Sequence, residues 1–326
     1  MEILLQFVLL VVGFVMLIKG ADWFVEGSAG IADKFGVPQL VIGLTIVAMG
    51  TSAPEAAVSI SAAFKGNADI TIGNVVGSNI LNVLIILGVT AVIINVAIQT
   101  STIKIELPYM IFISAVMLVL GFTGVKSADA DASFFNKSGY ITRIEGVILW
   151  ILFIAYLTYL FIMAKKNKSE EEDVKKQPMW KLILFGIIGL VLIVLGSDVT
   201  VDAASKIAEF FGMSERFIGL TVVALGTSLP ELFTSVTAAR KGKADIAIGN
   251  IVGSNIFNIL FVVGTTALIT PVKFQYKFIV DSVVAVVAGI VLLLSVLNKD
   301  KQLKRPAGII MLLCYAGYFT YLVVNL

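Results

Sequence analysis

Residues 43–82 read GLTIVAMGTSAPEAAVSISAAFKGNADITIGNVVGSNILN, and residues 219–258 read GLTVVALGTSLPELFTSVTAARKGKADIAIGNIVGSNIFN. The second stretch follows the first at a constant offset of 176 residues without a gap, and 27 of the 40 positions are identical. The match continues upstream, where Gly20 and Asp22 correspond to Gly196 and Asp198. The chain therefore contains two copies of one unit, and the identity is concentrated in polar residues.

The composition places these copies in a membrane. Of the 326 residues, 58% are hydrophobic and 14% are charged, whereas soluble domains contain about 25% charged residues. The net charge of +2 says nothing about a nucleic-acid partner, but the sequence has no basic arm and no basic-aromatic pattern, so none is expected. The chain has no histidine and one cysteine, Cys314, which excludes histidine-based catalysis, histidine zinc sites and an intramolecular disulfide.

The apolar segments are long enough to span a bilayer, which takes roughly 20 residues. Glu2 and the lack of a small-x-small cleavage site indicate that the first segment is retained. The second and seventh segments are interrupted by glycine and proline. We predict ten spans, over 3–24, 38–64, 69–95, 106–124, 142–164, 180–202, 214–240, 245–270, 275–297 and 306–324.

Five spans in each copy is an odd number, so the second copy is expected to enter the membrane upside down relative to the first. Inverted repeats of this kind are typical of secondary transporters, whose substrates bind near the midplane between the repeats. The predicted fold is an all-α integral membrane protein with ten transmembrane helices, of which the second and seventh are broken. Its parts are a first repeat over 1–164, a linker over 165–179 and a second repeat over 180–326.

The distribution of lysine and arginine predicts the orientation. If the hydrophilic linker is cytoplasmic, 15 lysine and arginine residues lie on its side and 8 on the other. Both termini are then extracellular in a multi-pass cell-membrane protein. The linker has about 15 residues, too few for a separate cytosolic sensor domain.

Each copy carries the motif Gly-Thr-Ser-x-Pro-Glu, at 50–55 and 226–231. A proline inside a helix releases the carbonyl four residues back, here at Gly50 and Gly226, and a simple kink is the alternative interpretation. Glu55 and Glu231 are harder to explain structurally, because ionisable residues inside a membrane span are costly and are usually functional.

A second motif, Gly-Asn-x-x-Gly-Ser-Asn-x-x-Asn, follows at 73–82 and 249–258. Its members four residues apart share one helix face. In the first copy these are Asn74, Ser78 and Asn82, and in the second Asn250, Ser254 and Asn258. Asparagine often bonds one membrane helix to another, and this remains the alternative interpretation, above all for the asparagines that would brace the site: Asn74, Asn79, Asn250 and Asn255.

The resulting set of ligands contains two carboxylates and several neutral oxygens. Hard cations prefer oxygen ligands, and Ca²⁺ accepts six to eight of them in flexible geometry. The formal charge of −2 balances one Ca²⁺ or part of the charge of several Na⁺. Because the site does not favour both loads together, they compete, and competition during alternating access produces antiport.

The two motifs resemble those of the Na⁺/Ca²⁺ exchangers in the cation/Ca²⁺ exchanger superfamily, particularly the prokaryotic members, and the resemblance covers essentially the whole chain. It implies a central cation site, sliding of the first helix of each repeat, and three Na⁺ per Ca²⁺. No cofactor is implied beyond the transported ions, and a monomer in membrane lipid is the expected functional form. The resemblance assigns the ion ligands as Glu55, Glu231, Thr51, Thr227, Ser52, Ser228, Ser78, Ser254, Ala48, Ala224, Asn82 and Asn258.

Asn258 departs from part of this pattern, because some prokaryotic members and the K⁺-dependent relatives have aspartate there. Asparagine resembles the K⁺-independent exchangers, which predicts K⁺ independence. Proton-coupled relatives usually carry Gly-Asn before the small-Pro-Glu element, so an H⁺/Ca²⁺ antiporter is the second hypothesis.

A cation channel is a hypothesis from a different class, because a pore could use the same oxygens. A channel usually needs a continuous path and often oligomeric symmetry, whereas broken helices in a duplicated monomer favour a carrier. An intramembrane aspartyl enzyme is disfavoured, since Asp22 and Asp198 lie near the ends of their spans and are interpreted as interfacial or gating residues. The sequence thus predicts a carrier that is not an enzyme.

Overall fold

The computed structural model describes residues 2–66, 68, 70–122, 138–166, 177–212, 224–275 and 278–325. These residues form helices and two short two-stranded sheets. Eight helices in this part of the chain are long and apolar enough to cross a membrane, and a bent helix pair raises the number to nine. The prediction of an all-helical membrane protein is confirmed. The start of the predicted seventh span, up to residue 223, and most of the predicted linker lie outside the described residues.

The helices pack into two compact units, and each unit takes segments from both halves of the sequence. Unit 1 consists of Met1–Thr51 and Ala164–Asn250, and unit 2 of Ser52–Met163 and Ile251–Leu326. The units are groups of packed segments and therefore differ from the predicted division of the sequence into two repeats. The chain passes from one unit to the other after Thr51, near the end of the helix over 143–166 and within the helix over 244–257.

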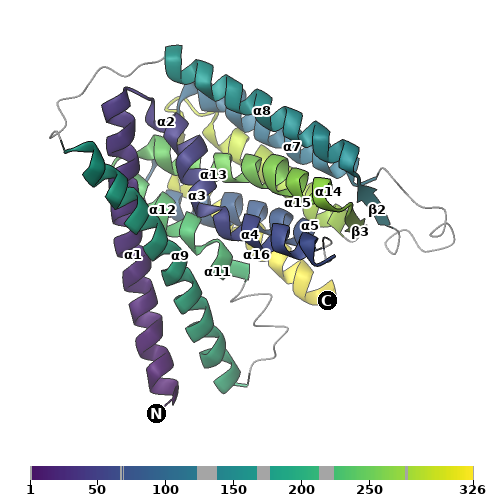
Figure 1. Ribbon diagram of the computed structural model, residues 1–326, viewed down its shortest axis with the longest axis horizontal. Helices are drawn as coiled ribbons and strands as arrows, with labels where there is room; N and C mark the ends of the chain where they lie inside the picture. Colours follow the sequence, from purple (N-terminus) through teal and green to yellow (C-terminus); the bar gives the residue numbers. More distant parts are fainter. Residues whose placement is uncertain are drawn as a thin grey trace. The chain divides into compact units, whose positions relative to one another are not determined.

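Two long helices dominate unit 1, α1 (Glu2–Phe35) and α9 (Met179–Phe210), which lie side by side in Figure 1. A Cβ atom added at Gly13 would lie 3.1 Å from the carbonyl oxygen of Gly196, and one at Gly20 would lie 2.8 Å from that of Gly189. Because the order of the partners reverses, the two helices are antiparallel. The glycines allow their backbones to come this close.

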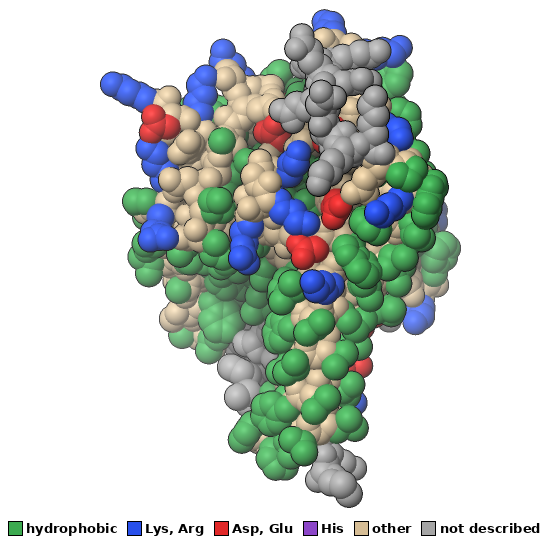
Figure 2. All heavy atoms as spheres, turned by 90° about the vertical axis from the view of Figure 1, so that its left-hand side faces the viewer, with side chains coloured by type: hydrophobic (Ala, Val, Ile, Leu, Met, Phe, Trp, Pro, Cys, Tyr) green, Lys and Arg blue, Asp and Glu red, His purple; other side chains and the backbone are tan. Residues whose placement is uncertain are grey.

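Both long helices continue beyond the predicted spans, which end at residues 24 and 202. The N-terminal part of α1, at the bottom of Figure 2, is covered by hydrophobic side chains, and charged side chains gather towards its other end. Some of these charges have partners: Asp22 pairs with Lys241 at 3.1 Å, and Asp33 with Lys243 at 3.9 Å. The helix therefore continues past its apolar run, and Asp33 in this continuation is paired.

Shorter elements complete unit 1. Its core includes four fully buried residues, Leu17, Val47, Ile193 and Ala238. The elements are α2 (Gln39–Ile42), the π-helical segment η1 (Gly43–Val47), α3 (Ala48–Thr51), α11 (Ala224–Thr227), α12 (Leu229–Arg240) and the first part of α13 (Ala244–Phe257).

Unit 2 contains the remaining helices and the sheets. Its first-half elements are α4 (Ala53–Phe64), α5 (Ile70–Leu81), η2 (Asn82–Leu87), α6 (Gly88–Ile93), η3 (Thr102–Glu106), α7 (Leu107–Leu120) and most of α8 (Arg143–Lys166). Its second-half elements are the end of α13, η7 (Asn258–Val263), α14 (Gly264–Ile269), α15 (Phe278–Val296) and α16 (Arg305–Asn325).

Both small sheets in unit 2 join a connection of one repeat to a connection of the other. The strand β1 (Val96–Ala97) pairs with β4 (Gln302–Leu303), and β2 (Ser138–Ile141) pairs with β3 (Val272–Gln275), both antiparallel. Strands β1 and β3 follow the third span of their repeats, whereas β2 and β4 lie between the fourth and fifth. Each sheet therefore pairs a third-to-fourth connection with a fourth-to-fifth connection.

An arginine begins the last helix of each repeat and binds the end of a helix from the other repeat. Arg143 donates to the carbonyl oxygens of Leu268 and Ile269, both at 3.2 Å. Arg305 donates at 2.9 Å to the carbonyl oxygen of Val92, which corresponds to Leu268 at the offset of 176. In each half of the sequence, an arginine thus binds the C-terminal carbonyl groups of a helix from the other half.

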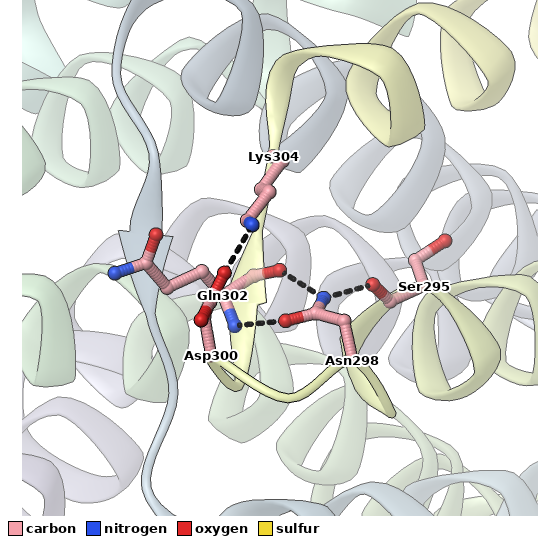
Figure 3. Close-up of polar contacts among 5 residues, drawn as sticks. All are labelled: Ser295, Asn298, Asp300, Gln302 and Lys304. Carbon is pink, nitrogen blue, oxygen red and sulfur yellow. Dashed lines mark hydrogen bonds and ion pairs between the residues drawn. The ribbon is translucent and has the colours of Figure 1, made fainter.

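The turn before Arg305 is closed by a side chain (Figure 3). Asn298 donates to the carbonyl oxygens of Ser295 at 2.9 Å and Gln302 at 2.6 Å, and its Oδ1 accepts from the backbone N–H of Gln302 at 3.2 Å. Lys304 forms an ion pair with Asp300 in the same turn. These bonds fix the point at which α16 begins.

Candidate functional site

The predicted break of the second span is present at Ser52. Helix α3 ends at Thr51, α4 begins at Ala53, and the two parts are bent by 50°. Pro54 lies in the first turn of α4, where its missing N–H has no intrahelical acceptor in any case. The proline therefore starts a new helix at this point.

The second copy repeats the break at Ser228, between α11 and α12, with Pro230 in the first turn of α12. Glu55 and Glu231 occupy the first turn of the helix that follows each break, and both side chains are fully buried. The positive end of the helix dipole favours a negative charge there. Each break thus places one buried carboxylate at the positive end of a helix.

The break also releases backbone carbonyls, and one of them has a partner that the sequence did not reveal. Ser197 of α9 donates to the carbonyl oxygen of Gly226 at 2.6 Å. The residue that corresponds to Ser197 in the first copy is Ala21, which has no hydroxyl group to offer Gly50. The two motifs therefore differ in how their released carbonyls are satisfied.

In unit 1, Asn250 connects three segments. Its Nδ2 donates to the carbonyl oxygen of Glu231 at 3.4 Å and to Oγ of Ser235 at 2.9 Å. The hydroxyl group of Thr51 lies 2.9 Å from Oδ1 of Asn250. Asn250 therefore fixes the backbone at Glu231 and joins it to the end of α3.

In unit 2, Asn74 makes the equivalent bonds. Its Nδ2 donates to the carbonyl oxygen of Glu55 at 3.1 Å and to Oγ of Ser59 at 2.9 Å. Every partner is displaced by 176 residues from its counterpart in unit 1. Each glutamate is thus braced by an asparagine from the next helix, the role that the sequence suggested for these asparagines. The two serines were missed, although both are identical between the copies.

The remaining predicted ligands in unit 2 lie on α5 with η2 and on α13 with η7. Ser78, Ser254, Asn82 and Asn258 are all buried. Nδ2 of Asn82 donates to Oδ1 of Asn255 at 3.0 Å, and Nδ2 of Asn258 donates to Oδ1 of Asn79 at 3.2 Å. These side chains form one network across the two helices.

Asn82 and Asn258 are also the first residues of the π-helical segments η2 and η7. Such segments are rare and frequently occur at functional sites, where the wider turn changes the direction of side chains. The sequence did not predict them, because nothing in the spacing of apolar residues distinguishes a π turn within a buried helix.

The twelve predicted ligands divide equally between the two units. Unit 1 holds Ala48, Thr51, Ala224, Thr227, Ser228 and Glu231; unit 2 holds Ser52, Glu55, Ser78, Asn82, Ser254 and Asn258. The ligand atoms available from their side chains are carboxylate, hydroxyl and amide oxygens, which suit Na⁺ and Ca²⁺. Among the described residues, no cluster of three or more His, Cys, Asp or Glu residues is suited to hold a resident metal ion.

Comparison with known proteins agrees with the resemblance in the motifs. The family described as "Sodium/calcium exchanger protein" matches residues 5–162 and 181–324. The chain is 38% identical to the putative antiporter CaxA of Alkalimonas amylolytica, over 95% of this chain and 96% of that protein. It is 32% identical to the sodium/calcium exchanger MaX1 of Methanosarcina acetivorans, over 98% and 99% of the two chains.

A solved structure supports the same conclusion. The sodium-calcium exchanger NCX_Mj, soaked with zero Na⁺ and Ca²⁺, superposes with a TM-score of 0.81 at 32% identity, and the match covers 98% of this chain and 99% of that one. The predicted relationship is therefore confirmed, and the chain belongs to the sodium/calcium exchanger family.

Proposed function

We propose that this protein exchanges Na⁺ for Ca²⁺ across the membrane by alternating access. The observation that carries the proposal is the pair of fully buried glutamates, Glu55 and Glu231, at equivalent helix starts within a membrane protein. Family membership supports exchange of a cation for Ca²⁺, and the names of MaX1 and NCX_Mj support Na⁺ as that cation.

The charge balance explains why the two ions exchange. Two carboxylates neutralise one Ca²⁺, or part of the charge of several Na⁺, but not both loads at once. Emptying the site would leave buried carboxylates without a counter-charge, which is costly in a medium of low dielectric constant. A carrier of this kind therefore changes its exposure with one load or the other bound, and antiport is the result.

The proposed architecture is ten helices in two inverted repeats, over 1–164 and 180–326, with the linker 165–179 between them. The antiparallel contact of α1 with α9, through Gly13 with Gly196 and Gly20 with Gly189, supports the inversion. The crossed pairing of connections in the sheets supports it too, because repeats of the same orientation would pair third-to-fourth connections with each other.

The twelve residues act together in the proposed central site between the repeats. Glu55 and Glu231 bind Ca²⁺ and also serve Na⁺, with backbone carbonyls of Thr51 and Thr227 as further Ca²⁺ ligands. Asn82 and Asn258 take the central side positions. The outer and inner Na⁺ ligands are Ala48, Ala224, Ser52, Ser228, Ser78 and Ser254.

The remaining parts of the proposal concern the setting of the protein. It works as a monomer and a carrier, not as an enzyme, with the linker cytoplasmic and both termini extracellular. Contacts within unit 1 support this orientation, because they join residues that were assigned to the same side of the membrane. Lys241 and Lys243 form ion pairs with α1, and Lys34 donates to the carbonyl oxygen of Gln177 in the linker. K⁺ is not required, because neutral asparagine occupies position 258.

Uptake of ⁴⁵Ca²⁺ into proteoliposomes tests the proposal. Vesicles loaded with Na⁺ and diluted into Na⁺-free buffer should accumulate Ca²⁺, and vesicles loaded with K⁺ should not. The Glu55→Gln variant should lose uptake, whereas Glu209→Gln, which changes an exposed glutamate at the end of α9, should retain it. Uptake driven only by a proton gradient would overturn Na⁺ coupling, and flux without any counter-ion would identify a channel.

A further inference from the structure

Asn79 and Asn255 hold each other across α5 and α13 in unit 2. Nδ2 of Asn79 donates at 3.2 Å to the backbone carbonyl of Asn255, and Nδ2 of Asn255 donates at 3.3 Å to the backbone carbonyl of Asn79. A carbonyl oxygen only accepts hydrogen bonds. Each side-chain amide must therefore turn its NH₂ group to the opposite backbone, which fixes the direction of its Oδ1 atom.

The fixed Oδ1 atoms determine the orientation of two further asparagines. Oδ1 of Asn79 accepts from Nδ2 of Asn258 at 3.2 Å, and Oδ1 of Asn255 accepts from Nδ2 of Asn82 at 3.0 Å. If Asn82 or Asn258 were flipped, two amide oxygens would face each other at this distance, and the bond would become a repulsion. The backbone carbonyls therefore fix the amide orientation of Asn79 and Asn255. These two side chains in turn fix the amide orientation of Asn258 and Asn82.

As a consequence, the Oδ1 atoms of Asn82 and Asn258 point away from the network. Both side chains are fully buried, and neither Oδ1 has a hydrogen-bond partner among the described residues. Burying an acceptor without a partner costs about 1–3 kcal/mol. Neutral amide oxygens are good ligands for Na⁺ and Ca²⁺, so a bound cation would remove this cost.

We infer that Asn79 and Asn255 are positioning residues, which aim the amide oxygens of Asn258 and Asn82 at the transported ion. The inference rests on the proposed function for the ligand role of Asn82 and Asn258. It adds the partition of roles: Asn79 acts through Asn258, and Asn255 acts through Asn82.

A double-mutant cycle on Ca²⁺ binding tests the inference. Equilibrium binding of ⁴⁵Ca²⁺ is measured on the purified full-length protein, so the result does not depend on which ion drives transport. Asn79→Ala and Asn258→Ala should each weaken Ca²⁺ affinity about tenfold, within the range for residues that orient a metal ligand. The double variant should be no weaker than Asn258→Ala alone, because Asn79 has then lost the side chain through which it acts.

The matched control combines Asn79→Ala with Asn82→Ala, since within the described part of the chain no hydrogen bond joins these two side chains. Here the losses in affinity should multiply to about a hundredfold. A merely structural role for Asn79 would give the same degree of additivity in both pairs, and this result would overturn the inference. Unchanged affinity in Asn79→Ala, or in Asn258→Ala, would overturn it as well.

Thermal unfolding and size-exclusion chromatography establish that each variant is folded. If Asn79→Ala does not fold, the reciprocal cycle replaces it. Asn255→Ala is then combined with Asn82→Ala as the test pair and with Asn258→Ala as the control pair. Failure of the proposed function would be seen separately, as a wild-type protein that binds Ca²⁺ but takes up none from Na⁺-loaded vesicles. The cycle would remain interpretable in that case, because it measures Ca²⁺ binding alone.

Discussion

The side chains of Asn79 and Asn255 donate to each other's backbone carbonyls, although 176 residues separate them in the sequence. Equivalent residues of the two copies thus meet at the place where α5 and α13 pack. The contact joins the copies through polar groups that lipid could not satisfy, and an unsatisfied amide in such surroundings costs several kcal/mol. The crossing is therefore suited to hold ligands in a defined geometry.

The carboxylates should dominate Ca²⁺ binding. Glu55→Gln and Glu231→Gln keep the shape and remove one charge each, which at 4 Å and an effective dielectric constant of about 20 is worth about 4 kcal/mol per pair of unit charges. Desolvation offsets part of this attraction, so we expect Ca²⁺ affinity to fall at least about a hundredfold. Saturating Ca²⁺, at a hundred times the wild-type Kd, should stabilise the wild-type protein by about 2.7 kcal/mol, and at the same Ca²⁺ concentration this gain should fall to about 0.4 kcal/mol or less in both variants.

Thermal unfolding with and without Ca²⁺ measures this effect, and Glu209→Gln serves as the control for an exposed glutamate. If Glu55→Gln kept the full Ca²⁺-dependent rise in Tm, Glu55 would not be a ligand.

The bracing bonds of Asn250 should contribute to stability. Asn250 bonds to Glu231, Ser235 and Thr51. With about 1 kcal/mol per bond, Asn250→Ala should lower the free energy of unfolding by about 3 kcal/mol. The difference in Tm between the purified variant and the wild-type protein measures this, and an unchanged Tm would mean that these bonds contribute nothing.

Close helix packing predicts opposite results for two glycines of the second motif. A Cβ atom at Gly249 would lie 3.0 Å from the backbone of Gly43, whereas one at Gly77 would meet nothing within 4 Å. Gly249→Ala should therefore destabilise the protein by about 1–3 kcal/mol through overpacking. Gly77→Ala should stabilise it by up to about 1 kcal/mol, because alanine favours the helix.

Of these two positions, the structure places close backbone packing at Gly249. Thermal unfolding of the two alanine variants in the same detergent measures the difference. A Gly249→Ala protein as stable as the wild type would show that the two segments separate without cost.

A buried glutamate outside the proposed site predicts a purely structural effect. Glu106 is fully buried and accepts a hydrogen bond from the hydroxyl group of Tyr159. Tyr159→Phe removes the donor and should cost about 1–3 kcal/mol of stability, because the acceptor stays buried.

Transport per folded molecule should be unaffected by Tyr159→Phe, since neither residue belongs to the twelve proposed ligands. A loss of Ca²⁺ uptake at unchanged stability would instead assign Glu106 a part in transport.

Much of the architecture could be predicted because its causes are local in the sequence. Apolar runs of sufficient length indicate membrane helices wherever they occur, and Pro54 and Pro230 mark the breaks by the hydrogen bonds that they cannot make. The repeat identified Glu55 and Glu231 as a pair without any knowledge of their surroundings. The helix ends were predicted less well, because α1 continues past its apolar run through charges that pair with distant residues.

The sequence by itself determined that the chain is a duplicated helical membrane protein, that each copy breaks at Gly-Thr-Ser-x-Pro-Glu, and that each break carries one glutamate. Only the tertiary structure decided which groups satisfy one another: Ser197 with Gly226, Asn250 with Thr51, and the direction of the amides of Asn82 and Asn258. The physical reason is that a side-chain amide has no preferred direction of its own. Its orientation depends on the partner that packing brings within hydrogen-bonding distance, and for these asparagines the partners lie between 15 and 199 residues away.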